Sequence, residues 1–173
     1  MIKGATAVKA KIKNKAGSNS DKSQIILRIY LMERFLERVS LSQYRDNFVL
    51  KGGLLVSSLV GVDMRSTMDV DTTVKSLPLN KVSAQKILEE IIAIKLEDGV
   101  AFRIAKVQDI MEGHEYGGIR FMIECMIDKL KQIIKIDIST GDEITPRAIA
   151  YSLPLIIEDR TINLWAYNLE TLL

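Results

Sequence analysis

Two aspartates, Asp69 and Asp71, are separated by a single residue in a segment, residues 68–74, whose composition predicts a β-strand. Side chains alternate between the two faces of a strand, so both carboxylates are expected on one face. Carboxylate oxygens are the hard ligands that Mg²⁺ prefers, and one or two of them commonly hold the ion together with substrate phosphates. By itself the pattern is also typical of two solvated aspartates at a sheet edge. It indicates a metal site only if other features of such a site accompany it in the sequence.

A pair of glycines, Gly52 and Gly53, stands between a short apolar run at residues 48–50 and a second apolar segment at residues 54–60. This order predicts a strand, a glycine turn and a helix. Glycine lets the backbone approach a phosphate closely, and a helix N-terminus offers free N–H donors at the positive end of its dipole. The pair is therefore a candidate cradle for a triphosphate, although a tight strand-to-helix turn would use the same residues.

A third aspartate, Asp137, lies in residues 133–139, where isoleucines alternate with polar residues. The alternation predicts a strand with one face in the core and Asp137 on the other face. If this strand neighbours the strand of Asp69 and Asp71, the three carboxylates share one surface.

Three segments together resemble the AbiEii/AbiGii nucleotidyltransferase toxins in order and spacing: FVLKGG at 48–53, RSTMDVD at 65–71 and IDISTGDEITP at 136–146. The resemblance extends from the helix around residues 33–36 to residues 168–170. That family belongs to the DNA polymerase β-like nucleotidyltransferase superfamily and supplies the toxin of two-gene abortive-infection and toxin–antitoxin systems. The resemblance implies an α+β fold in which a mixed sheet is flanked by helices.

The resemblance also implies a reaction, in which an NTP bound at Gly52 and Gly53 is attacked at its α-phosphorus and pyrophosphate leaves. The implied cofactor is Mg²⁺, since in two-metal sites one ion activates the attacking hydroxyl and the other steadies the leaving phosphates. Asp69 and Asp71 would bridge the ions. Asp137 would bind the ion on the nucleophile side and accept the proton of the attacking hydroxyl.

Two basic residues, Lys51 and Arg65, are candidates for neutralising the phosphate charge. Lys51 is equally explained as a residue at the end of a strand, and Arg65 as the partner of a carboxylate that shapes the turn. Thr67 is expected to orient an aspartate or the loop rather than to touch the substrate.

The resemblance implies an RNA, such as a tRNA, or a protein as the acceptor, and a cognate antitoxin as a partner. Two alternatives stay open. A metal-dependent glycosyltransferase also uses Asp-x-Asp, but normally after a longer nucleotide-binding region than the 68 residues that precede Asp69. A non-catalytic nucleotide- or partner-binding module is the alternative from another class, because the known toxins continue into a helical C-terminal portion that this sequence is expected to lack.

The bulk composition narrows the class of protein. The chain has 173 residues, of which 47% are hydrophobic, enough for one domain with a buried core. Its apolar runs are shorter than the ~20 residues that cross a bilayer, and its first residues do not resemble a secretion signal, so a cytoplasmic protein without membrane contact is expected. The single histidine, His114, is expected in an exposed turn, and the single cysteine, Cys125, is expected to be buried and inert.

The net charge of +2 is unevenly distributed, because lysines concentrate near the N-terminus. We divide the chain into a basic N-terminal arm, residues 1–22, and a nucleotidyltransferase domain, residues 23–173. Such an arm attracts nucleic-acid phosphates without sequence preference, but the pattern is more typical of a solvated, partly frayed terminus.

The remaining elements are predicted from hydrophobic periodicity. Helices are expected at residues 25–39 and 83–95, and further strands at residues 100–110, 119–127, 151–157 and 161–167. A last helix is predicted to open at residue 168, with Trp165, Leu169, Leu172 and Leu173 on one face. It would be too short to be stable alone, so we expect it to pack on a further helical segment and the chain by itself to transfer little nucleotide.

Overall fold

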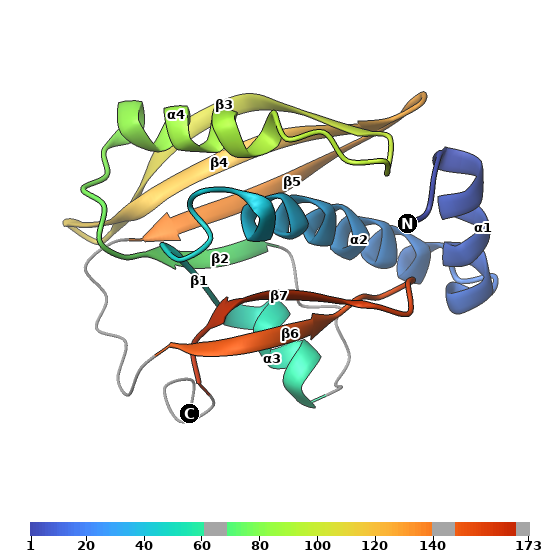
Figure 1. Cartoon of the computed structure of the whole chain (residues 1–173). Coiled ribbons are helices and arrows are strands. Elements are labelled where there is room, and N and C mark those ends of the chain that lie inside the picture. The colour runs from blue at the N-terminus through green and yellow to red at the C-terminus, as the bar shows by residue number, and fades with distance from the viewer. Residues whose placement is uncertain (61–68, 140–147, 169–173) are drawn as a thin grey trace.

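The computed structural model describes residues 1–60, 69–139 and 148–168 (Figure 1). Its elements, in chain order, are α1 (Ala5–Ala16), α2 (Ser20–Leu41), β1 (Phe48–Lys51), α3 (Gly52–Val60), β2 (Asp69–Val74), α4 (Lys81–Ile92), β3 (Val100–Glu112), β4 (Glu115–Ile127), β5 (Leu130–Ser139), β6 (Ile149–Pro154) and β7 (Thr161–Ala166). The predicted α+β class is confirmed.

Among the described residues, seven strands form one mixed sheet in the order β3-β4-β5-β2-β1-β7-β6. Strands β3, β4 and β5 pair as successive antiparallel neighbours. Strand β2 then joins β5 in parallel, and β1 lies antiparallel to β2 and parallel to β7. The parallel pairing of β2 with β5 places the strand of the first two aspartates beside the strand of the third.

The turn between β4 and β5 determines how these two strands pair. A two-residue turn connects Ile127 to its partner Leu130, and Asp128 within it has φ of 52°. Tight hairpin turns use such positive φ values and fix the register of the strands that they join. Counting back along both strands from this turn places Arg120 opposite Asp137.

Helix α2 lies between the β3–β5 part of the sheet and the β6–β7 hairpin (Figure 1). Its N-cap is Asn19, whose side chain accepts the N–H of Lys22 at 3.0 Å. This cap places the start of the helix at Ser20, earlier than the predicted residue 25, because a side-chain acceptor satisfies the free N–H groups of the first turn. Apolar side chains such as Phe35, which is 0% exposed, anchor the helix in the core.

Helix α1 is folded onto the rest of the protein, whereas the sequence suggested a solvated and partly frayed segment. The N–H of its first residue donates to Asp128 in the β4–β5 turn at 2.8 Å. Its buried side recurs at helical spacing and consists of Ala5, Val8, Ile12 and Ala16. The interleaved lysines concealed this apolar side in the sequence. The division of the chain at residue 22 stays a prediction.

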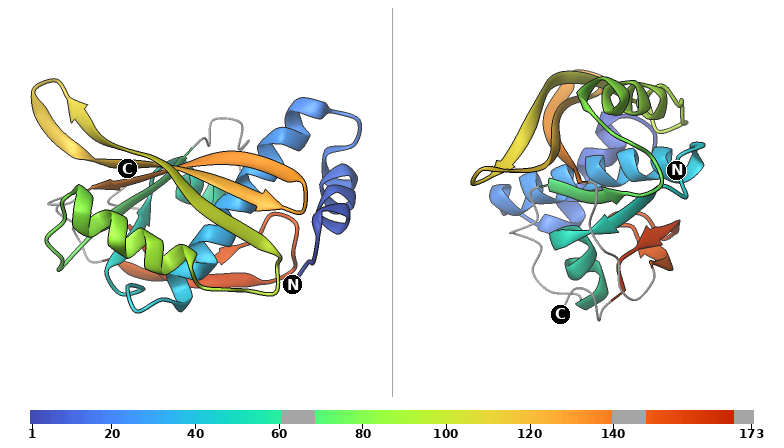
Figure 2. Two further views of the ribbon diagram at one scale, coloured as in Figure 1. Left: turned by 90° about the horizontal axis from the view of Figure 1, so that it is seen from above. Right: turned by 90° about the vertical axis from the view of Figure 1, so that its left-hand side faces the viewer.

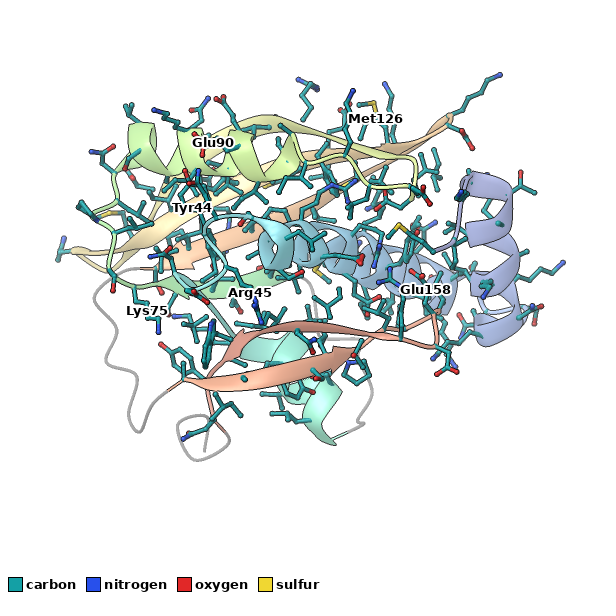
Figure 3. All side chains as sticks on the ribbon, in the orientation of Figure 1. Tyr44, Arg45, Lys75, Glu90, Met126 and Glu158 are labelled. Atoms are coloured by element: carbon teal, nitrogen blue, oxygen red, sulfur yellow. The ribbon has the colours of Figure 1, made fainter. Side chains whose placement is uncertain are left out.

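Helix α2 carries two arginines, Arg34 and Arg38, that are 0% and 1% exposed. Arg38 donates two N–H groups to the two oxygens of Asp98, each at 2.9 Å. Arg34 donates to Glu37 at 2.7 Å and lies 3.6 Å from Glu158, a residue of the β6–β7 connection that Figure 3 places beside α2. Buried charges require such partners, so this network joins α2 to the segments before β3 and after β6.

The carboxyl group of Glu33, which is 2% exposed, gives this core a pH dependence. It accepts the N–H of Ile156 at 3.0 Å, but burial outweighs this bond and raises its pKa from 4.5 to about 8. Because the folded pKa lies above the unfolded value, the native state loses stability as pH rises from 4.5 to about 8.

We therefore expect Glu33→Gln, which keeps an acceptor for Ile156, to melt about 5 °C higher than the parent at pH 9. The two proteins should melt alike at pH 4, where the parent carboxyl is neutral. Thermal unfolding followed by circular dichroism measures this difference, and identical melting at both pH values would contradict it.

The other predicted elements differ from the structure mainly in their ends. The strand predicted at residues 151–157 is β6, and the last helix falls on residues 169–173, outside the described residues. His114 is exposed in the β3–β4 turn, and Cys125 is buried, as predicted.

Figure 2 shows the β3–β4 hairpin projecting beyond the rest of the sheet. Across the described part of the chain, no helix is both long and apolar enough to span a membrane.

Candidate active site

A row of four charged residues crosses the middle of the sheet. Strand pairing aligns Lys51 of β1 with Asp71 of β2, Asp71 with Asp137 of β5, and Asp137 with Arg120 of β4. Residues directly opposite one another on paired strands project from the same face. The row therefore presents a cation, two neighbouring carboxylates and a second cation, and it meets the condition under which the sequence predicted that Asp137 would join the other aspartates.

Asp69 extends this surface by one further row. It stands opposite Lys135 on β5, and it lies two residues from Asp71, so it projects from the same face. Val70 separates Asp69 from Asp71 on β2, and its partner on β5 is Ile136. Both of these apolar residues are 0% exposed. The apolar face of the two strands is thus held in the core, and this burial presents the three carboxylates on the opposite face.

A group of hydroxyl side chains lies beside Lys51, at the β1 end of the charged row. Thr73 and Ser139 are opposite each other on β2 and β5, with their oxygens 3.2 Å apart. The Lys51 ammonium donates to the Ser139 hydroxyl at 2.7 Å, and the Tyr167 hydroxyl lies 3.0 Å from that of Thr73. These contacts hold Lys51, one of the two predicted phosphate-binding residues, next to Asp71.

Arg120, which the sequence reasoning did not select, is bonded to Asp137. Its Nε and Nη2 atoms each donate to one oxygen of Asp137 at 2.8 Å, and Nη2 lies 3.8 Å from Asp69. These bonds raise the pKa of the guanidinium above its already high value. The two-residue turn after Ile127 was the signal that could have revealed Arg120, because it fixes the register of β4 against β5.

Burial and neighbouring negative charge disfavour the charged forms of Asp69 and Asp71. Burial, followed by the charges of Asp137 and Asp69, raises the pKa of Asp71 from 3.8 to about 6. Burial and the charge of Asp137 also raise the pKa of Asp69. Like charges disfavour ionisation when they are close, and a cation among them removes the repulsion. The surface is therefore suited to bind a positive ion.

One atom of this surface fits a metal ligand in particular. Asp69 Oδ1 is buried and has no hydrogen-bond partner in the part of the chain that the structure describes, which is costly for an oxygen unless an ion or water reaches it. Across residues 1–60, 69–139 and 148–168, no three acidic, histidine or cysteine side chains stand close enough together to hold a metal. Both oxygens of Asp137 are bonded to Arg120, so Asp69 and Asp71 are the two aspartates of this surface whose carboxylates are not engaged in this way and whose chemistry fits a divalent cation.

Gly52 lies at the junction of β1 and α3, against Asp71. It has φ of 76°, and a Cβ atom added there would stand 2.2 Å from Asp71 Oδ2 and 2.9 Å from Asp71 Cβ. Glycine is therefore required both for the backbone conformation and for the close approach to the carboxylate. Gly53, which is exposed, follows in the first turn of α3. Arg65 and Thr67 lie outside the described residues.

We expect Gly52→Ala to lower the free energy of unfolding by about 1–3 kcal/mol, because it combines a disfavoured φ with a displaced Asp71. It should also weaken metal-dependent NTP binding. Gly53→Ala is the matched control, since Gly53 has helical backbone and alanine stabilises helices relative to glycine. Urea denaturation of both variants tests the contrast, and equal stabilities would contradict it.

A mixed sheet that sets an Asp-x-Asp strand beside a strand with a third aspartate, next to a glycine turn and a helix, has the arrangement of the polymerase β-like nucleotidyltransferase fold. The family comparison agrees with this class. Residues 34–173 match the family described as the nucleotidyl transferase AbiEii toxin of type IV toxin–antitoxin systems. The chain belongs to the AbiEii family.

Two solved structures are similar to this chain. The crystal structure of JHP933 from Helicobacter pylori is 16% identical, with a TM-score of 0.48 over 86% of this chain and 54% of that one. A second H. pylori structure, described provisionally as a nucleotidyltransferase, is 15% identical, with a TM-score of 0.50 over 86% of this chain and 56% of its own. The chain thus spans about half the length of either. No curated protein matches it.

Proposed function

We propose that this chain carries the catalytic site of a Mg²⁺-dependent toxin that transfers a nucleotide from an NTP to an RNA or a protein. Family membership supports the general class, nucleotidyl transfer by a toxin. The observation that carries the finer assignment is the alignment of Lys51, Asp71 and Asp137 in one row across three strands, with Gly52 packed against Asp71. This row joins a phosphate-binding end to an acidic end.

At the phosphate-binding end, the backbone of Gly52 and Gly53 and the N-terminus of α3 would receive the triphosphate of the NTP. Lys51, held by Ser139 at 2.7 Å, would neutralise part of its charge. Bound Mg²⁺ would supply charge compensation for the phosphates and lower the pKa of the acceptor hydroxyl. Asp69 and Asp71 are the residues that fit its binding, through hard oxygens on one strand face.

At the acidic end, Asp137 would serve the acceptor side. The acceptor oxygen forms a bond to the α-phosphorus, the bond between that phosphorus and the bridging oxygen breaks, and pyrophosphate leaves with the electron pair. The proton of the acceptor hydroxyl passes to Asp137. The carbonyl of Asp137 accepts the Thr72 hydroxyl at 3.1 Å, which fixes the backbone from which the carboxylate projects.

The physiological setting is part of the same proposal. As a member of a toxin family, the chain would act in the cytoplasm on an RNA, such as a tRNA, or on a protein, and would be opposed by a cognate antitoxin. Its use in abortive infection would follow from the same chemistry, because nucleotide transfer to an essential RNA stops growth of an infected cell.

Transfer of label from an NTP tests the proposal. The protein is incubated with Mg²⁺, tRNA or total protein, and NTPs labelled at either the α- or the γ-phosphate. Label from the α-position alone is expected in the acceptor. Asp137→Asn should keep much of the NTP affinity, which the contacts of the triphosphate would supply, but transfer at least about 100-fold more slowly, because Asp137 is assigned to the step after the triphosphate is seated.

Other outcomes separate the alternatives. Undiminished transfer by Asp137→Asn would make Asp137 structural, and transfer from a nucleotide sugar would favour a glycosyltransferase. Binding of NTP without transfer to either class of acceptor would support a non-catalytic module.

A further inference from the structure

Arg120 occupies both carboxylate oxygens of Asp137, which would otherwise be available to a metal ion. Its guanidinium engages both oxygens of Asp137 at 2.8 Å and stands 3.8 Å from Asp69, so it faces two of the three aspartates of the proposed site. A fork-shaped, two-bond contact between a guanidinium and a carboxylate is among the strongest pairings in proteins. While it persists, the Asp137 oxygens are already engaged by a cation.

This pair differs from the structural arginines of the core. The side chains of Arg38 and Asp98 are 1% and 0% exposed, whereas those of Arg120 and Asp137 are 29% and 15% exposed. A partly exposed guanidinium gives up its partner at a much smaller desolvation cost than a buried one. Arg120 can therefore neutralise part of the negative charge of the aspartates and can also release Asp137 at low cost.

We propose that Arg120 is an internal counter-cation, which competes with a divalent metal ion for Asp137 and thereby sets how tightly the ion is held. This rests on the proposed function only in that the ion belongs to that site. Without the ion, Arg120 reduces the repulsion among the carboxylates. When the ion binds, Asp137 turns from Arg120 toward Asp69 and Asp71.

Competition between Arg120 and the ion predicts a measurable change in metal affinity. The apparent affinity of a ligand falls by the fraction of molecules in the binding-competent state. If Arg120 holds Asp137 in about nine molecules of ten, its removal strengthens metal binding about tenfold. A positioning residue would act in the opposite direction, because loss of its support would misplace Asp137 and weaken the binding.

The test is Mn²⁺ binding without nucleotide, followed by isothermal titration calorimetry and by the electron paramagnetic resonance signal of free Mn²⁺. Arg120→Gln is compared with the parent and with Lys135→Gln. Lys135 lies on the same face of β5, two residues from Asp137, and acts on Asp69 only through its charge. Both variants lose one positive charge, but only Arg120→Gln releases the oxygens of Asp137.

We expect about tenfold tighter Mn²⁺ binding in Arg120→Gln, less than threefold in Lys135→Gln, and an intermediate value in Arg120→Lys, which keeps the charge without the fork. In EDTA, Arg120→Gln should melt several degrees below the parent, and Mn²⁺ should raise its melting temperature more than that of the parent. Should Arg120→Gln be unfolded in EDTA, Mn²⁺ restores its folding, and Arg120→Lys provides the affinity comparison.

Equal or weaker Mn²⁺ binding in Arg120→Gln would overturn the competition and leave the proposed function standing. An equal increase in Mn²⁺ affinity in Lys135→Gln and Arg120→Gln would show that the loss of one positive charge explains the effect, and would overturn the competition. Absence of Mn²⁺ binding in the parent and in Arg120→Gln alike would remove the metal site itself, and with it both proposals.

Discussion

Replacing Asp71 with alanine is expected to abolish Mg²⁺-dependent NTP binding while the fold remains intact. Asp71 is the carboxylate at the centre of the charged row, between Lys51 and Asp137, and it also contacts the glycine turn. Each 1.4 kcal/mol of lost binding free energy weakens binding about tenfold, so the loss of a central carboxylate ligand is expected to weaken metal-dependent NTP binding by more than about 100-fold. Asp69→Ala should have the same effect, because Asp69 Oδ1 is buried and has no hydrogen-bond partner among the described residues.

The same variants should not destabilise the metal-free protein. The pKa of Asp71 is raised to about 6 by burial and by its two acidic neighbours, so its ionisation lowers stability as pH rises from 3.8 to about 6. At pH 8 in EDTA, Asp71→Ala should melt at or up to about 4 °C above the parent, after allowance for solvent screening.

The measurement is thermal unfolding with and without Mg²⁺ and NTP, which raise the melting temperature of a protein that binds them. Asp109→Ala is the control, since Asp109 is a half-exposed residue of β3 that pairs with Lys81 at 3.3 Å. It should keep the full ligand-induced shift. An equal shift in Asp71→Ala and the parent would show that the metal site is wrongly assigned.

A loss of about 3–5 kcal/mol in the free energy of unfolding is expected for Arg38→Ala. Arg38 is 1% exposed, and its removal leaves the carboxylate of Asp98, which is 0% exposed, without its two charged hydrogen bonds. Burial raises the pKa of Asp98, but those bonds and the Val100 N–H outweigh it and hold the pKa below its ordinary value. The variant would therefore keep a buried carboxylate whose remaining cationic partner is Arg34, at 3.6 Å.

The exposed pair of Arg103 and Glu124, whose atoms are 3.1 Å apart, is the matched control. Arg103→Ala removes the same kind of side chain from a pair on strands β3 and β4 and should cost less than about 1 kcal/mol. Urea denaturation gives both values. Similar losses in the two variants would show that burial does not determine the contribution of the pair.

The sequence by itself determined the features that depend on neighbours along the chain. Alternation within residues 68–74 and 133–139 sufficed to place Asp69 and Asp71 on one face and Asp137 on a polar face, because the side-chain period of a strand is local. The glycine pair at the junction of β1 and α3 and the order of most helices and strands were predictable for the same reason. The three segments also sufficed for the family, which the match over residues 34–173 shows.

Contacts between distant segments were decided only by the tertiary structure. Strand β2 could pair with any of several later strands, and only its parallel pairing with β5 sets Asp71 beside Asp137. Arg120 was missed because its partner is 17 residues away, across a turn whose type was not recognised. Helix α1 is bonded at its first residue to Asp128, which is 123 residues from Ala5. Periodicity records which face of an element is apolar, whereas the choice of partner depends on the free energy of the whole packed core.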